Sequence, residues 1–189
     1  MAITKHSIGE RQDVFIADVL SSVVSSMQVP ILPLQNPITY YTVNLEIGRN
    51  NDIIDSLLSY DNNQRSDLKY PLIAVLMPIP EKNSSGFLEV NFQRIVFANL
   101  TKTNTGSEKI FDKYSSDGVF KTILRPCFKE FIKQLAFSVY TGIGDPDMYD
   151  YTYKEIPSKA SISEQIPNDF VDIVEILDLK VILNNLKQC

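Results

Sequence analysis

The most regular pattern of apolar and polar residues lies in the segment Val119–Tyr140. Apolar side chains recur there at steps of three and four, which places them on one wide stripe of a helix. The stripe consists of Phe120, Ile123, Leu124, Cys127, Phe128, Phe131, Ile132, Leu135, Ala136 and Val139. Pro126 lies inside the pattern, but the stripe stays in phase across it, so we predict a kinked helix rather than a break. Such a stripe needs a sheet to cover.

Four runs have the patterns of strands. Thr39–Ile47 alternates between apolar and polar residues, as a half-buried strand does. Tyr70–Met77 is continuously apolar and predicts a central strand buried on both faces. Phe87–Leu100 alternates strongly and is expected to pair with it as an antiparallel hairpin across a turn-rich connection at residues 81–86. Val171–Leu183 predicts a last strand.

The alternation also assigns side chains to sheet faces. On the long strand, one face is expected to carry Leu88, Val90, Phe92, Val96, Ala98 and Leu100. On the last strand, one face is expected to carry Ile173, Leu177, Leu179, Val181 and Leu183. Glu175 interrupts the second set and Arg94 interrupts the first. Arg94 either reaches an edge or pairs with a carboxylate, or it serves as an interface arginine on an oligomer surface.

Two further helices are predicted. The first runs from about Ile8 to about Met27 after a capping-box pattern, and the second covers Asn51–Tyr60. Prolines exclude regular helix from the segment Val29–Pro37. We interpret it as a connector extended on the core, with an exposed docking arm as the alternative.

The segment at residues 141–169 shows no clear periodicity and is rich in tyrosine, a residue favoured at protein interfaces. It is either an arm between subunits or a loop folded back over its own sheet. Tyr149, Tyr151 and Tyr153 are therefore candidate subunit-interface residues. Together these elements predict one α/β (α+β) domain over residues 1–189. Its mixed, largely antiparallel sheet has about four strands and is flanked by two long helices, with long extended loops.

Composition and charge argue against several classes of function. The chain has 189 residues and a net charge of −5, which argues against a general binder of nucleic acids or anionic membranes. Two cysteines indicate no disulfide framework, so a reducing compartment fits best. The polar N-terminus lacks the pattern of a signal peptide, and no run is long enough to span a membrane. We therefore expect a protein that is made and used in a cytoplasm.

Candidate chemistry is sparse. The one histidine, His6, lies near the N-terminus, and no phosphate-binding or dinucleotide-binding glycine motif occurs. Cys127 lies on the apolar stripe and is interpreted as a core residue. Asp145, Asp147 and Asp150 are spaced acidic residues, but no calcium-loop pattern follows them, so a solvated turn is favoured over a metal site. We expect no enzyme activity, no cofactor and no metal.

One charge pattern stands out. Lys121, Arg125, Lys129 and Lys133 recur every four residues along the main helix. This row is either a solvated face or a surface for a partner's acidic patch or a phosphate backbone. Lys121, Arg125 and Lys129 are therefore candidate interface residues together with Arg94.

Several local runs resemble a known family. They are Lys69-Tyr70-Pro71-Leu72-Ile73, the hairpin with Arg94 in QRIVFANL, and Phe120-Lys121 with Ile123-Leu124-Arg125-Pro126 before the long helix. In this order of elements the chain resembles the tail terminator and head–tail connector proteins of tailed bacteriophages. It looks most like the neck or tail-ring proteins of Bacteroides phages, including the crAss-like group. The likeness covers about Thr39–Tyr140 and the last strand.

The resemblance implies a structural virion protein that assembles in the host bacterial cytoplasm. It implies a homo-oligomeric ring of six or twelve copies in the neck or tail, between portal, connector and tail proteins. DNA would pass through its lumen without specific binding. The alternative is a small cytoplasmic adaptor or regulatory module that binds a protein through the basic row or the tyrosine-rich segment.

Overall fold

The fold is known from a computed structural model. It describes residues 15–32, 34, 36–63, 68–84, 87–100, 118–137, 141–143, 151–156 and 171–184. Within these residues, seven strands form one sheet. The strands are β1 (Asn44–Gly48), β2 (Leu72–Leu76), β3 (Glu81–Ser84), β4 (Phe87–Leu100), β5 (Thr141–Ile143), β6 (Tyr151–Ile156) and β7 (Val171–Asn184). The helices are α1 (Ile16–Ser25), α2 (Asn50–Asn62) and α3 (Arg125–Phe137), which follows the π-helical turn η2 (Phe120–Leu124).

The long strands β4 and β7 form the centre of the sheet. The order is β1-β2-β4-β7-β5, with β3 also beside β4 and β6 also beside β7. β1 and β2 are parallel and are joined by α2 as a crossover, while all other pairs are antiparallel. The predicted α+β class with a mixed, largely antiparallel sheet is therefore confirmed. The expected four strands were too few, because the short strands β3, β5 and β6 were missed.

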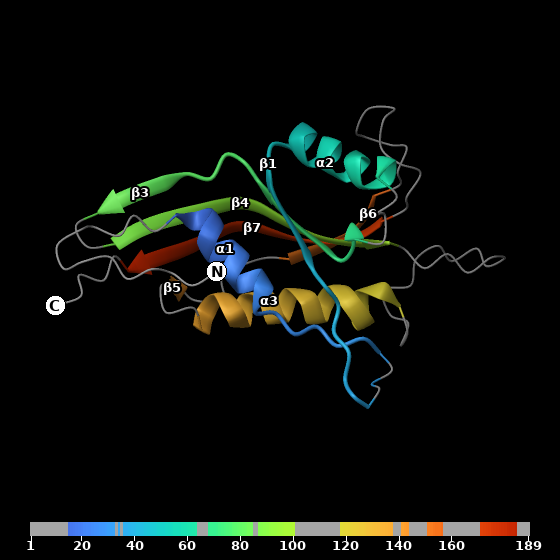
Figure 1. Cartoon of the computed structure of the whole chain (residues 1–189). Coiled ribbons are helices and arrows are strands. Elements are labelled where there is room, and N and C mark those ends of the chain that lie inside the picture. The colour runs from blue at the N-terminus through green and yellow to red at the C-terminus, as the bar shows by residue number, and fades with distance from the viewer. Residues whose placement is uncertain are drawn as a thin grey trace.

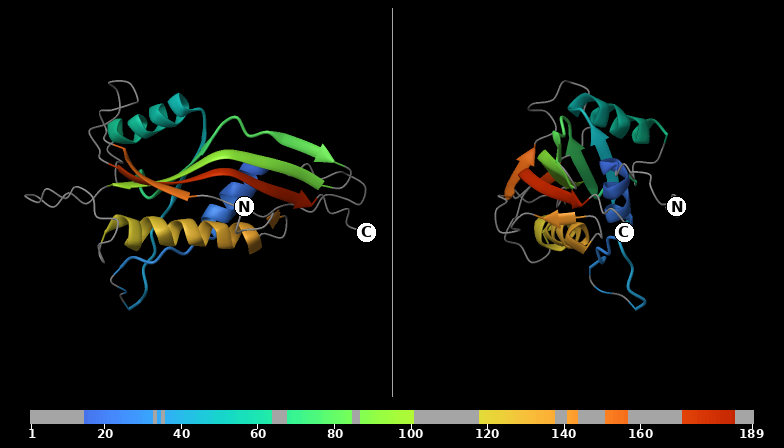
Figure 2. Two further views of the ribbon diagram at one scale, coloured as in Figure 1. Left: turned by 180° about the vertical axis from the view of Figure 1, so that it is seen from behind. Right: turned by 90° about the vertical axis from the view of Figure 1, so that its left-hand side faces the viewer.

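Helices cover both sides of the sheet (Figure 1). One side packs against α1, η2 and α3, and we call it the lower face, as it is drawn. The other side carries α2 over one end, and we call it the upper face. Figure 2 shows the same layers from behind and from one end. The connection between α1 and β1 extends below the body in all three views.

Most of the core lies on the lower face. Phe97 of β4 makes edge-to-face contacts with Phe128 and Phe131 of α3, at ring-centroid distances of 5.9 and 5.4 Å. The apolar stripe predicted for the main helix packs there from Phe120 to Leu135, which confirms the helix and its orientation. Ala136, predicted as part of the stripe, is exposed near the end of α3, and Val139 lies outside the described residues. A smaller core on the upper face consists of Ile53, Leu72, Ala74, Ala98 and Ile173.

The main helix runs through Pro126 without a break, as the phase of its stripe predicts. The backbone N–H of Arg125 donates to the carbonyl of Phe120, five residues back. This π-helical turn lies directly before the proline, which has no N–H to donate. The change in winding is thus absorbed where the regular hydrogen-bond ladder is interrupted anyway.

Near the midpoints of β4 and β7, the alternation of side chains between the two faces of the sheet shifts by one residue. The face assignments predicted from a strict alternation are therefore wrong. The lower-face core contains Val90 and Phe92 but then Ile95 and Phe97, so two residues are skipped instead of one. Across the sheet, β7 places Val174 and Ile176, then Leu179, Val181 and Leu183, in the same core. Val96, Ala98 and Ile173 consequently belong to the upper face.

The cause of this shift is visible in the backbone. Asp178 has a φ of 57°, in the left-handed region that aspartate tolerates better than most residues. The paired register of β4 and β7 omits only Gln93 and Asp178. Alternation on the two sides of this point is regular, but the two halves are out of phase, which a strict period of two could not predict.

Three predicted segments differ in detail. The strand expected from Thr39 begins only at Asn44, because residues 39–41 pair with residues 29–31 instead. The expected turn at residues 81–86 contains β3, which pairs with β4. The segment at residues 141–169 contains β5 and β6, which both pair with β7, so its described parts fold back on their own sheet. The first helix is described from Ile16, and its expected start lies outside the described residues.

Candidate functional site

The candidate interface residues fall into separate regions. Lys121, Arg125 and Lys129 lie together on the exposed side of η2 and α3. Arg94 lies on the opposite side of the sheet, because its partner Glu175 pairs in register with Val96 of the upper-face core. Tyr151 and Tyr153 lie in β6, opposite Ile176 and Val174 of β7. Tyr149 lies outside the described residues, as do the aspartates at positions 145, 147 and 150.

Arg94 and Glu175 form an ion pair that joins the two central strands. The Nε–H of Arg94 donates to Oε1 of Glu175 at 2.9 Å, and its terminal Nη2 contacts the same oxygen. The Glu175 side chain is 1% exposed and that of Arg94 is 42% exposed. The two polar residues that interrupt apolar strands thus compensate each other, as buried charge requires. This confirms the carboxylate-pairing alternative for Arg94.

Two more charged residues are buried. Lys69 is 1% exposed and Asp172 is 3% exposed, and each has an interaction partner. Periodicity did not mark either residue as a buried charge, because Lys69 lies shortly before β2 and Asp172 is the second residue of β7, so both resemble solvated strand ends. Burial with a partner indicates a structural role.

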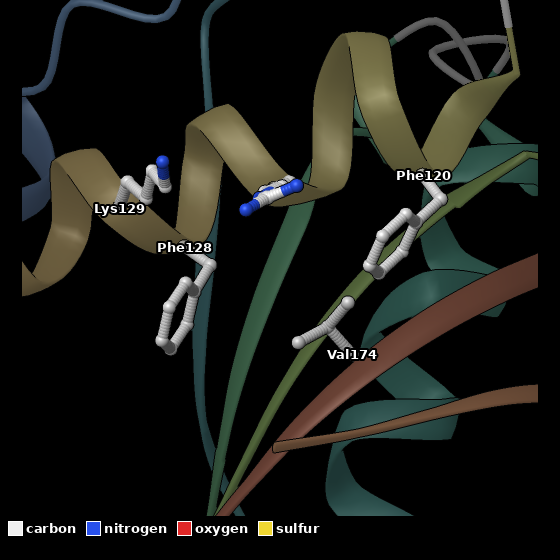
Figure 3. A pocket seen from close by; sticks show the side chains of 5 residues that line it. Phe120, Phe128, Lys129 and Val174 are labelled. Atoms are coloured by element: carbon white, nitrogen blue, oxygen red, sulfur yellow. The ribbon is translucent and has the colours of Figure 1, made fainter. Parts of the chain in front are cut away.

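The basic row borders a small hollow (Figure 3). Its lining comprises Phe120, Arg125, Phe128 and Lys129 of the helix and Val174 of β7, and its volume is about 90 Å³. Phe120 and Phe128 point from the helix toward the sheet, whereas the amine of Lys129 points away from it. The hollow therefore has an apolar floor and a cationic rim, which suits an apolar side chain accompanied by a carboxylate.

A polar cluster fixes the middle of α3. Lys133 Nζ donates to Glu130 Oε2 at 3.1 Å, and Gln134 Nε2 donates to Glu130 Oε1 at 2.7 Å. Burial alone would raise the pKa of Glu130. The hydrogen bonds from Gln134 and Lys133, the charge of Lys133 and the backbone N–H of Gln28 outweigh it, so the pKa is lowered. Lys133 is thereby engaged within the helix, unlike the other three cations of the row.

Cys127 is unsuited to nucleophilic chemistry. The side chain is buried in the lower-face core, and burial raises the pKa of its thiol to about 12. A thiolate is the reactive form, and almost none exists at neutral pH when the pKa is this high. The prediction that Cys127 is a core residue is therefore confirmed.

The connection between α1 and β1 is a projecting hairpin, which we call the 29–41 hairpin. Ile31 N–H donates to Thr39 C=O and Tyr41 N–H donates to Val29 C=O, both at 2.9 Å. Val29, at its base, is fully buried in the lower-face core. Figures 1 and 2 show the hairpin extending away from the sheet beyond α3.

The outer part of this hairpin exposes large apolar side chains. The exposed fractions are 45% for Leu32, 62% for Leu34, 49% for Ile38 and 45% for Tyr40. The outer part of the segment is thus exposed, as the docking-arm alternative requires, and does not lie on the core. We had not predicted these four residues as site residues. The signal was available, because leucines and isoleucines spaced by prolines cannot pack as a regular strand.

Metal-binding clusters and membrane-spanning helices are both absent from the described part of the chain. Among those residues, no three His, Cys, Asp or Glu side chains lie close enough to hold a metal ion. No helix within the described ranges is both long and apolar enough to cross a membrane. Comparison with known protein families, curated proteins and solved structures finds no match for this chain.

Proposed function

We propose that the chain is a self-associating structural subunit whose 29–41 hairpin contacts the next copy. The observation that carries this proposal is the exposure of Leu32, Leu34, Ile38 and Tyr40 on a hairpin that projects from a well-packed body. Single exposed apolar residues are ordinary, but a group on one projecting segment marks an interaction site. The buried base at Val29 anchors the hairpin, so it can transmit force to the sheet.

The chemistry of the hairpin favours a protein partner. Residues 29–41 contain no charged side chain, so they offer nothing to the phosphates of a nucleic acid. Pro30 and Pro37 have no N–H donors, so the hairpin edge is a poor template for another strand. Contact must therefore come from the side chains, packed into an apolar surface of the partner. A copy of the same chain meets this need if each body accepts one hairpin and offers one, which closes a ring.

The finer proposal is a ring in the neck or tail of a tailed phage, acting as a head–tail connector or tail terminator. It is supported by the resemblance described above and by the absence of a convincing catalytic motif in the sequence. The proposed ring has six or twelve copies, stands between portal, connector and tail proteins, and lets DNA pass without specific binding. A net charge of −5 suits a lumen that DNA must leave easily.

Light scattering on the purified chain tests the proposal. We expect a mass of six or twelve times the 21.4 kDa of one chain. Immunogold labelling of virions with an antibody against the chain should place it at the neck or tail. A protein that stays monomeric at high concentration and does not label virions contradicts the proposal.

A further inference from the structure

The segments β1–α2 and η2–α3, which lie on opposite faces of the sheet, carry opposite net charge. Between Asn44 and Asn62 the upper-face segment has one basic residue, Arg49, and four acidic ones: Glu46, Asp52, Asp55 and Asp61. Between Gly118 and Phe137 the lower-face segment has one acidic residue, Glu130, and four basic ones: Lys121, Arg125, Lys129 and Lys133. A basic helical segment thus lies on one face of the sheet, and an acidic strand and helix, β1 and α2, lie on the other side (Figure 1).

On the basic side, three cations are open to a partner. Lys121, Arg125 and Lys129 are all exposed, and no hydrogen bond or ion pair joins them to the described residues. Adjacent members of the row are four residues apart, which is about 6 Å along a helix. The hollow between the helix and β7 opens beside Arg125 and Lys129. The surface therefore recognises two or three anionic groups with an apolar side chain beside them.

On the acidic side, α2 offers this combination. Asp52 and Asp55 are exposed, one turn apart. Leu58, three residues beyond Asp55, is only half-buried and therefore lies close to the same exposed side. The two carboxylates match the two cations beside the hollow, and the leucine matches its apolar floor.

We propose that the acidic side of α2 in one copy contacts the basic row of α3 in the next. The inference rests on the proposed self-association and names a second surface used in it, separate from the 29–41 hairpin. The two surfaces lie on opposite faces of one sheet, so the contact is head-to-tail, as a ring requires. Arg125 and Lys129 face Asp55 and Asp52 of the neighbour, and Leu58 of the neighbour fills the hollow.

A second copy explains the surface better than DNA does. A phosphate backbone would use the cations but leave the apolar floor of Phe120, Phe128 and Val174 unfilled. An open row of cations would also retain the DNA that the proposed ring must release. Contact with the acidic side of α2 neutralises the row and covers the hollow at once.

Charge reversal tests the inference. One variant carries Arg125→Glu and Lys129→Glu, and the other carries Asp52→Asn and Asp55→Lys. Asn is chosen at position 52 because Asp52 Oδ2 accepts the N–H of Arg49 at the start of α2, which an amide oxygen can still do. Each variant alone should raise the dissociation constant of assembly about a hundredfold, since like charges then meet.

An equimolar mixture of the two variants should recover the wild-type mass in light scattering. In an alternating ring every contact again joins opposite charges, and both six and twelve allow alternation. The control is Lys82→Glu with Lys180→Glu, on exposed residues of β3 and β7. It changes the net charge by as much as Arg125→Glu with Lys129→Glu does, and it should assemble like the wild type. Circular dichroism of each variant should match the wild type.

Three outcomes overturn the inference. Assembly that is insensitive to both reversals removes this contact but leaves the proposed function intact. Wild-type protein that binds duplex DNA, with binding lost in Arg125→Glu and Lys129→Glu, assigns the row to nucleic acid instead. A wild-type chain that is monomeric under all conditions removes the inference and the proposed function together.

Discussion

Large apolar side chains are buried in the core of the body but exposed on the 29–41 hairpin. In the body, Phe97 and Phe131 are fully buried and packed edge to face. In the hairpin, Leu34 and Ile38 are 62% and 49% exposed. Other exposed apolar side chains, such as Phe15, Met77 and Phe137, are spread over separate elements, whereas those of the hairpin are grouped on one short segment. This grouping is the reason for proposing that the hairpin's apolar surface serves association.

The largest effect is expected in the body. Phe131→Ala removes a fully buried ring that contacts Phe97 and leaves a cavity in the lower-face core. We expect a loss of about 3–5 kcal/mol in the free energy of unfolding, measured by chemical denaturation. A loss below about 1 kcal/mol would show that the packing on the lower face is looser than its contacts indicate.

A smaller but still large effect is expected at the ion pair. Arg94→Met leaves the carboxylate of Glu175 buried without its guanidinium, which should cost about 3 kcal/mol. The double variant Arg94→Met with Glu175→Met removes both charges and should recover most of that loss. If the single variant is as stable as the wild type, the pair does not hold β4 to β7.

The same pair shows what sequence could and could not predict. Arg94 and Glu175 were recognised as exceptions in apolar strands, but their partnership was not, because they are far apart in the chain. Periodicity found α2, β2, β4 and β7 within one or two residues, since each has a strong pattern of its own. It also found the main helix, whose described part, η2 and α3, ends at Phe137 inside the predicted Val119–Tyr140. The short strands β3, β5 and β6 have too few residues for a pattern, and pairing with a long neighbour creates them.

The candidate site was predicted only in part, because local patterns do not encode how distant segments lie relative to one another. The spacing of Lys121, Arg125 and Lys129 placed them correctly on one side of a helix. Their position across the sheet from α2 depends on the β1-α2-β2 crossover, which no local pattern encodes. The shift at Asp178 was also hidden, because apolar residues occur on both sides of the strands beyond it.

A modest, pH-dependent effect is expected at Glu130. Its pKa is lowered from the ordinary 4.5, so its contribution to stability is complete above about pH 4.5 and is lost as pH falls through the folded pKa. Glu130→Gln should lower the free energy of unfolding at neutral pH by about 1 kcal/mol or less. Denaturation curves at pH 7 and pH 3 should show this difference shrinking in acid. A difference that is equal at both values would contradict the role of the charge.

The smallest effect on folding is expected in the hairpin. Leu34→Ser replaces a side chain that is 62% exposed and makes little contact with the body. The free energy of unfolding of the monomer should change by about 0.5 kcal/mol or less. Chemical denaturation at a concentration too low for assembly measures it. A loss as large as that of Phe131→Ala would mean that the hairpin belongs to the core.

The most direct test of the central claim is the mass of the hairpin variant Leu34→Ser with Ile38→Ser, measured by light scattering beside the wild type. Met77→Ser is the matched control, because Met77 is 53% exposed but lies outside the hairpin. We predict a multimer for the wild type and the control, and a mass close to one chain for the hairpin variant. A hairpin variant that keeps the mass of the wild type would contradict the claim that this hairpin joins the subunits.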